Sequence, residues 1–197
     1  MAKIKSALEK ALEKAEELGK LTDEEKEKMK KEEELKSLLS EFYKGRIDRD
    51  GLWQRLKGSA PSFLKEVQQN LADSIGLGST SEEFQKREDG ILAVETLKDI
   101  RKVPEIEDIL AEIESLRNEY QEGKDKVAQE LREAVEKNPQ LRMQPVRTPD
   151  GKTVYQAAVS VDEAVQARIS EFLAQHEETF GAEFNRMIMS LKWALSE

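Results

Sequence analysis

The only histidine of the chain, His176, has the side chain best suited to acid–base catalysis or metal binding near neutral pH. Its surroundings, HEETF, do not form the HExxH pattern of a zinc protease. His176 also lies on a stripe of apolar residues at helical spacing, which is typical of a packed side chain. We therefore expect an interior residue, with a pH-sensitive helix contact as the alternative.

Two short motifs match ligand-binding loops only in part. DRDG at 48–51 has its glycine in fourth place, whereas a calcium loop of the EF-hand type needs it in sixth. GLGSTS at 76–81 lacks the Gly-Lys-Ser/Thr ending of a phosphate loop, and no predicted strand precedes it. We expect Asp48 to cap a helix, and residues 76–81 to form a linker that ends in a helix cap.

Carboxylate pairs such as Glu112 and Glu119 recur along the chain, so no single pair stands out. The absence of cysteine excludes disulfides, thiol catalysis and zinc–thiolate centres. A di-metal centre in a helix bundle requires Glu-x-x-His repeats, which one histidine does not supply. The sequence predicts a protein that is not an enzyme, with no catalytic, cofactor-binding or metal site.

The composition favours long, solvent-exposed helices. Of 197 residues, 38% are hydrophobic and 37% are charged, and the net charge is -9. An acidic surface repels nucleic acid, and no apolar run approaches the ~20 residues that span a bilayer. The N-terminus, MAKIKSALEK, lacks the apolar region of a signal peptide. We expect a cytoplasmic protein that binds neither membranes nor nucleic acid.

Two segments of equal length, 104–138 and 161–195, have the apolar spacing of long helices. Equal lengths and matching stripes predict an antiparallel, coiled-coil-like pair. The expected contacts include Ile113 and Leu116 on the first helix and Phe172 and Phe180 on the second. Met189, Trp193 and Leu195 lie off the main stripe, so we expect the end of the second helix to be buried on two sides.

The N-terminal half predicts smaller elements. TDEE at 22–25 is a capping box that begins a helix. Residues 1–44 are so rich in charge that we expect a helical arm burying little, either solvated or ordered on a partner. Residues 45–80 predict a small helical module around Trp53. The predicted domains are therefore 1–44, 45–80 and 81–197.

Residues 141–159, LRMQPVRTPDGKTVYQAAV, have a β pattern between the two long helices. TPDG fits a turn that pairs Met143 with Ala157 and Pro145 with Tyr155, and this register places most apolar side chains on one face. The sequence therefore predicts a mainly α fold. It comprises a long antiparallel helix pair joined by a single β-hairpin, a small N-terminal helical module and a charged helical arm.

We expect the hairpin to fold onto the helix pair, to join two copies of the chain or to bind another protein. The residues expected to contact a partner are Arg142, Met143, Arg147, Lys152, Tyr155 and Val159. A helix pair bridged by a hairpin is similar in layout to prefoldin-type chaperones, although the two share no motif. The predicted function is a non-catalytic interaction module: an oligomeric scaffold, adaptor or chaperone-like binder. The alternative is a regulator that docks on a nucleic-acid-associated machine through local basic patches.

Overall fold

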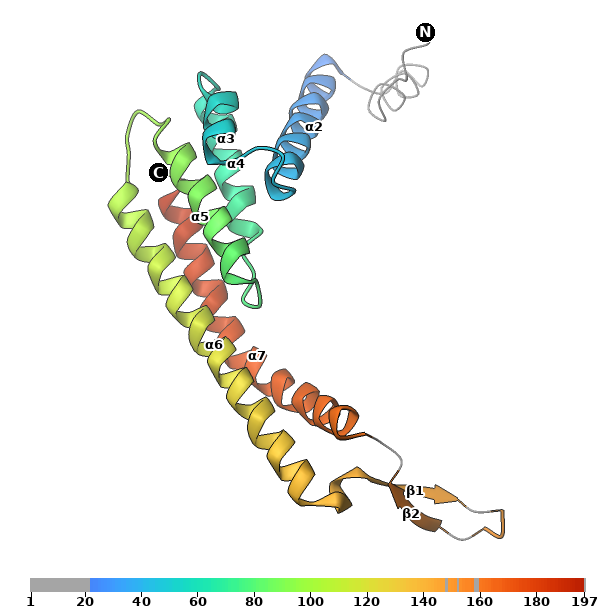
Figure 1. The fold of residues 1–197 in the computed structure, drawn as a ribbon. Helices are drawn as coiled ribbons and strands as arrows, with labels where there is room; N and C mark the ends of the chain where they lie inside the picture. The colour runs from blue at the N-terminus through green and yellow to red at the C-terminus, as the bar shows by residue number, and fades with distance from the viewer. Residues whose placement is uncertain (1–21, 148, 152, 158–159, 197) are drawn as a thin grey trace. The chain divides into compact units, whose positions relative to one another are not determined.

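The computed structural model describes residues 22–147, 149–151, 153–157 and 160–196. They form six α-helices, one 3-10 helix (η1) and two short strands (Figure 1). Contacts divide these residues into two compact units, 22–74 with 85–103 and 196, and 75–84 with 104–195. Each unit is described by itself. The predicted three-domain division stays a prediction, because a compact unit need not fold independently.

The first unit contains α2 (Asp23–Tyr43), α3 (Arg49–Leu56), α4 (Pro61–Asp73) and most of α5 (Ser81–Glu95). The predicted capping box is present, since the Thr22 hydroxyl accepts from the Glu25 amide and the Glu25 carboxylate accepts from the Thr22 amide. Asp48 caps α3 by accepting from the Gly51 amide at 2.8 Å. These caps satisfy amide groups that have no partner inside a helix.

The C-terminal half of α2 is part of the core of the first unit. Its side chains at positions 35, 38, 39 and 42 are buried, with Phe42 only 1% exposed. The predicted charged arm is therefore wrong for this part of the chain. Charges surround these four residues, but their spacing forms one apolar face, and that face decides where the helix packs. The other large buried apolar side chains of this unit are Leu52, Leu56, Leu64, Val67, Leu71, Ile91 and Val94.

Gly90 allows close packing inside the first unit. It lies within α5, which continues past it without interruption, and it is buried. A Cβ atom at this position would lie 2.9 Å from Cε1 of Phe42 and 3.2 Å from Cδ1 of Leu71. Only glycine therefore lets α5 lie against these side chains at the observed distance.

The second unit contains a long antiparallel helix pair, shown side by side in Figure 1. The helices are α6 (Val103–Lys137) and α7 (Val161–Ala194), so the predicted spans 104–138 and 161–195 are confirmed within one residue at each end. The directions follow from contacts at two levels. Tyr120 contacts Glu177 and Phe180, whereas Val135, later in α6, packs with Val165, earlier in α7.

The end of the pair nearest the connection has an apolar cluster of its own. It consists of Val135 with Ala164, Val165 and Ile169 of α7. Partly buried residues pack against it: Ala128, Leu131, Leu141 and Val161. Leu141 belongs to η1 (Pro139–Arg142), and Arg168 of α7 donates a hydrogen bond to its carbonyl at 3.1 Å. The chain is therefore attached to the helix pair before the strands begin.

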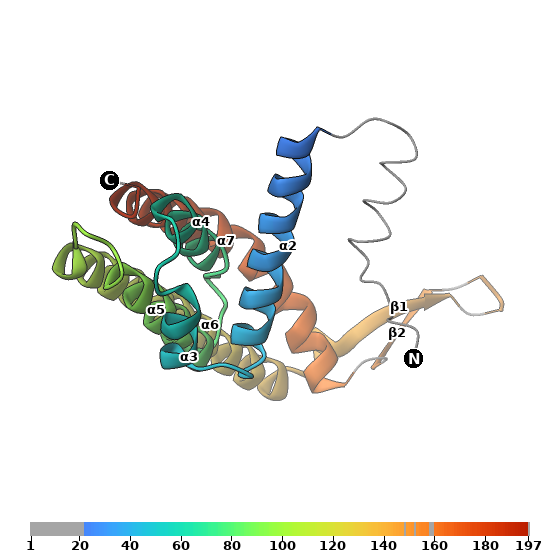
Figure 2. The same ribbon diagram turned by 90° about the horizontal axis from the view of Figure 1, so that it is seen from above.

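The predicted fold class is wrong in including a β-hairpin, because the architecture is all-α. Among the described residues, only β1 (Met143–Arg147) and β2 (Thr153–Ala157) pair, with Met143 opposite Ala157 and Pro145 opposite Tyr155. A single pair of five-residue strands is too small to form a layer of the fold. Their ribbon projects past the ends of α6 and α7 in both views (Figure 1 and Figure 2), and Met143 is 42% exposed. The first strand is shorter than expected because Leu141 and Arg142 belong to η1.

A buried arginine attaches the 76–80 loop to α6 in the second unit. Arg117 is 4% exposed, and its guanidinium donates to the carbonyls of Gly76, Ser79 and Thr80. The same group lies 4.5 Å from the ring centre of Phe84. A planar, permanently charged guanidinium satisfies several carbonyls at once, which a lysine ammonium cannot do with the same geometry.

Replacing Gly90 with alanine tests the close packing of α5. We expect Gly90→Ala to destabilise the protein by about 1 kcal/mol, because overpacking a buried contact outweighs the gain in helix propensity. The matched control is Gly181→Ala, since Gly181 lies in α7 with no atom near the added methyl group. This control should stabilise by up to about 1 kcal/mol. Urea unfolding measures both changes, and stabilisation by both substitutions would contradict the packing at Gly90.

Replacing Arg117 with methionine tests the attachment of the loop. We expect Arg117→Met to cost about 3 kcal/mol or more, because three carbonyls lose a charged donor in a buried setting. Arg132→Met is the control on the same helix. Arg132 forms an exposed ion pair with Asp162 at 2.6 Å, and its loss should cost less than about 1 kcal/mol. Equal losses of stability for the two variants would show that Arg117 does not hold the loop.

Candidate interaction surfaces

His176 lies in an aromatic cluster between α6 and α7. Its ring centre is 4.7 Å from those of Phe172 and Phe180 and 6.1 Å from that of Tyr120. A Cβ atom at Gly123 would lie 3.2 Å from its Nε2 atom, so the glycine leaves room for the imidazole. His176 is thus a packed residue of the helix pair, as its place on the apolar stripe predicted.

Tyr120 adds the polar contact of this cluster. Its hydroxyl donates a hydrogen bond to the Glu177 carboxylate at 3.2 Å. Burial, and then the negative charge of Glu177, raise the pKa of the Tyr120 phenol. The phenol therefore stays protonated at neutral pH and serves as a donor that ties α6 to α7.

The 76–81 loop does not present the groups that a phosphate needs. A phosphate loop directs backbone N–H groups at its ligand, whereas three carbonyl oxygens of this loop point at Arg117. The amide of Gly76 is occupied too, since it donates to the Ser79 hydroxyl at 3.1 Å. The loop is a structural linker, and Thr80 at its end accepts from the Glu83 amide, as expected for a helix cap.

The described residues contain no group of three or more His, Asp or Glu side chains arranged to hold a metal ion. Among the described helices, none has both the length and the apolar character needed to cross a bilayer. The cytoplasmic location stays a prediction.

A buried carboxylate, Glu95, organises the end of α5 in the first unit. It is 1% exposed and accepts from Gln68 at 2.9 Å, from the Lys98 ammonium at 2.8 Å and from the Lys102 amide at 2.9 Å. Burial would raise the pKa of Glu95, but these donors outweigh it and lower the pKa below its ordinary value. A carboxylate held ionised by three donors closes a loop and lacks the raised pKa of a general acid.

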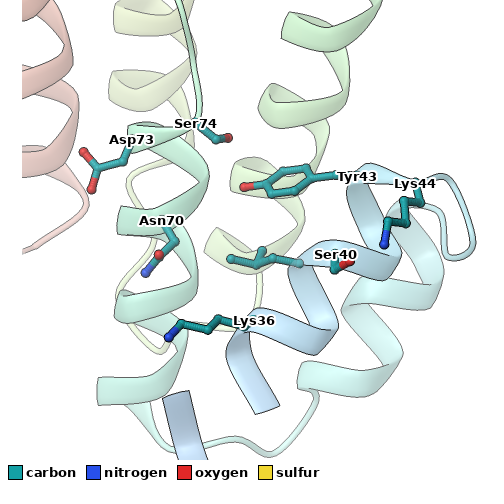
Figure 3. Close-up of a pocket in the computed structure, with 8 residues that line it drawn as sticks. Lys36, Ser40, Tyr43, Lys44, Asn70, Asp73 and Ser74 are labelled. Carbon is teal, nitrogen blue, oxygen red and sulfur yellow. The ribbon is translucent and has the colours of Figure 1, made fainter. Parts of the chain in front are cut away.

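An open hollow of about 490 Å³ lies between α2 and α4 in the first unit (Figure 3). Lys36 extends from α2 towards Asn70 of α4, and the hydroxyl of Tyr43 points towards Ser74. Burial raises the pKa of the Tyr43 phenol, so this group remains a neutral hydrogen-bonding residue. The remaining lining residues are Leu39, Ser40, Lys44 and Asp73. Seven of the eight lining residues have a polar or charged side chain, and Leu39 is the exception.

The residues predicted to contact a partner are found in different settings. Arg142 is half-buried in η1, and its Nε atom has no hydrogen-bond acceptor among the described residues. Met143 and Arg147 are exposed on β1. Lys152 and Val159 lie outside the described residues, as does the side chain of Tyr155. Their role in binding stays a prediction.

The sequence did not predict the exposed apolar surface at the C-terminal end of α7. Met189 is 66% exposed and Trp193, one helical turn later, is 62% exposed. Arg186 and Ser190 are exposed beside them. Met189 and Trp193 do lie off the main apolar stripe, as predicted, but of the three residues expected to be buried there only Leu195 is, at 1% exposed. We call Arg186, Met189, Ser190 and Trp193 the α7 face.

The network around Glu95 makes stability depend on pH. The pKa of Glu95 is lower in the folded chain than in the unfolded chain. Its contribution to the free energy of unfolding is therefore fully present above its pKa in the unfolded chain, and is lost as pH falls through its pKa in the folded chain. We expect Glu95→Gln to destabilise by about 1–3 kcal/mol at pH 7, since an amide directs a donor at other donors. Urea unfolding of both proteins at pH 7 and below about pH 4 measures this. The difference between them should narrow in acid, and a constant difference would contradict this role of the carboxylate.

No curated protein and no solved structure significantly matches the chain. The model of a family of unknown function, DUF6657, matches residues 52–197. The α7 face lies within the matched residues, whereas every α2 residue that lines the hollow lies before them. Since the match covers most of the chain, the protein belongs to the DUF6657 family of unknown function.

Proposed function

We propose that the protein is a non-catalytic helical interaction module and that it binds a protein partner through the α7 face. The observation that supports this most is the exposure of Met189 and Trp193 on adjacent turns of one helix. Burying both side chains against a partner removes apolar surface from water, which is the main driving force of protein association.

The residue types of the α7 face favour binding. Tryptophan, methionine and arginine are enriched in protein interfaces, and tryptophan and arginine often contribute most of the binding energy. Four large apolar side chains among the described residues are well exposed: Ile100, Met143, Met189 and Trp193. Scattered single cases are normal on a protein surface, but two on one helical face form a patch.

Packing on the opposite side of α7 holds this patch in a fixed conformation. Around the α7 face, the side chains of Ile188 and Leu191 point inward and are at most 9% exposed. The exposed residues are therefore carried on a helix whose opposite side is packed. A preformed helix face loses little conformational entropy when it binds, in contrast to a flexible loop.

A photo-crosslinking residue in place of Met189 tests the proposal. We expect covalent protein adducts in cells that produce the full chain, with specific masses, and loss of these adducts when Trp193→Glu is added. Glu178 is the control position, because it is also exposed on α7 but lies three helical turns away. Circular dichroism should show that Trp193→Glu keeps its helices. Equal adducts at positions 178 and 189, or adducts that persist in Trp193→Glu, would contradict the proposal.

A further inference from the structure

We infer that the partner of the α7 face is the same face of a second copy of the chain, bound antiparallel about a two-fold axis between Met189 and Ser190. This inference rests on the proposed function and specifies its partner. A two-fold contact brings one surface patch against itself, so the patch must be complementary to itself.

The spacing of the α7 face meets this condition. Arg186 and Trp193 lie at equal distances in the sequence from the point between Met189 and Ser190, on opposite sides of it. Reversing one helix about that point places Arg186 of each copy opposite Trp193 of the other. A guanidinium over an indole ring is among the most favourable cation–π pairs. A parallel arrangement would instead place Arg186 against Arg186.

Arg186 can make this contact with little loss of stability in its own chain. Its present partner is Glu183, at 3.1 Å, in a pair whose side chains are 76% and 47% exposed. Such an exposed pair on a helix surface contributes little to stability. The guanidinium can therefore turn from Glu183 to an indole ring of a second copy, and its charge stays at the edge of the contact.

Small side chains let the two helices approach each other. Ser190 lies at the axis, opposite Met189 of the other copy, and Ala182 is exposed two turns earlier on α7. Two tryptophans and two methionines then form the centre of the contact. The surface that four side chains of each copy would bury is below the ~1,200 Å² at the lower end of standard interfaces. We therefore expect weak, concentration-dependent association.

Introduced cysteines test the position of the axis directly, because the chain has none of its own. Ser190→Cys places the two thiols beside the axis, whereas Glu178→Cys, on the same helix, places them about 35 Å apart along the helix direction. Under mild oxidation of the full chain, we expect Ser190→Cys to form disulfide-linked dimers at least about 10-fold faster than Glu178→Cys. Adding Trp193→Glu should reduce its rate to that of the control. Equal rates for the two cysteine variants would overturn the inference.

Sedimentation equilibrium of the cysteine-free chain separates this inference from the proposed function. We expect the average mass to rise towards that of a dimer with concentration in the wild type, and to stay monomeric for Trp193→Glu and Arg186→Glu. A dimer that both variants retain would overturn the inference. A monomer at all concentrations, together with a foreign protein crosslinked at position 189, would overturn self-association and leave the proposed interaction function standing. A monomer without any specific adduct would overturn both.

Discussion

The antiparallel contact between α6 and α7 is the constraint on which the rest of the second unit depends. Both helices carry many charges, and each has one main apolar stripe that the other helix covers. Among the described residues, contacts at two levels join them: Val135 with Val165, and Tyr120 with His176 and Phe180. Once these residues face inward, the rotation of α7 about its axis is fixed. The α7 face is exposed as a consequence of that rotation.

Sequence periodicity and capping chemistry were sufficient to predict much of the fold. The spans of α6 and α7 follow from apolar spacing over many turns, and the start of α2 follows from the capping box at Thr22. Such signals are local, so a single sequence contains them. The burial of the α2 side chains near Phe42 was missed because the charges around them dominate the composition. The need for glycine at position 90 depends on contacts with other helices, which local patterns do not reveal.

For the candidate surfaces too, the sequence predicts what depends on local spacing and not what depends on contacts between helices. That Met189 and Trp193 lie off the main stripe was readable from the sequence, but which off-stripe residues would be covered was not. Leu195 is buried and the other two are exposed, although all three are apolar. The β pattern of residues 141–159 misled the fold class, since its first residues pack with the helices as part of η1.

Nuclear Overhauser effects at the ring of His176 test the contact between α6 and α7 most directly. His176 is the only histidine, so its ring protons are identified without ambiguity. Its ring centre lies 6.1 Å from that of Tyr120, on the opposite helix, and 4.7 Å from that of Phe180. We expect cross-peaks from the imidazole to both aromatic rings in the whole chain. Cross-peaks to Phe180 without any to Tyr120 would show that α7 does not lie against α6 in this register, and would contradict the account.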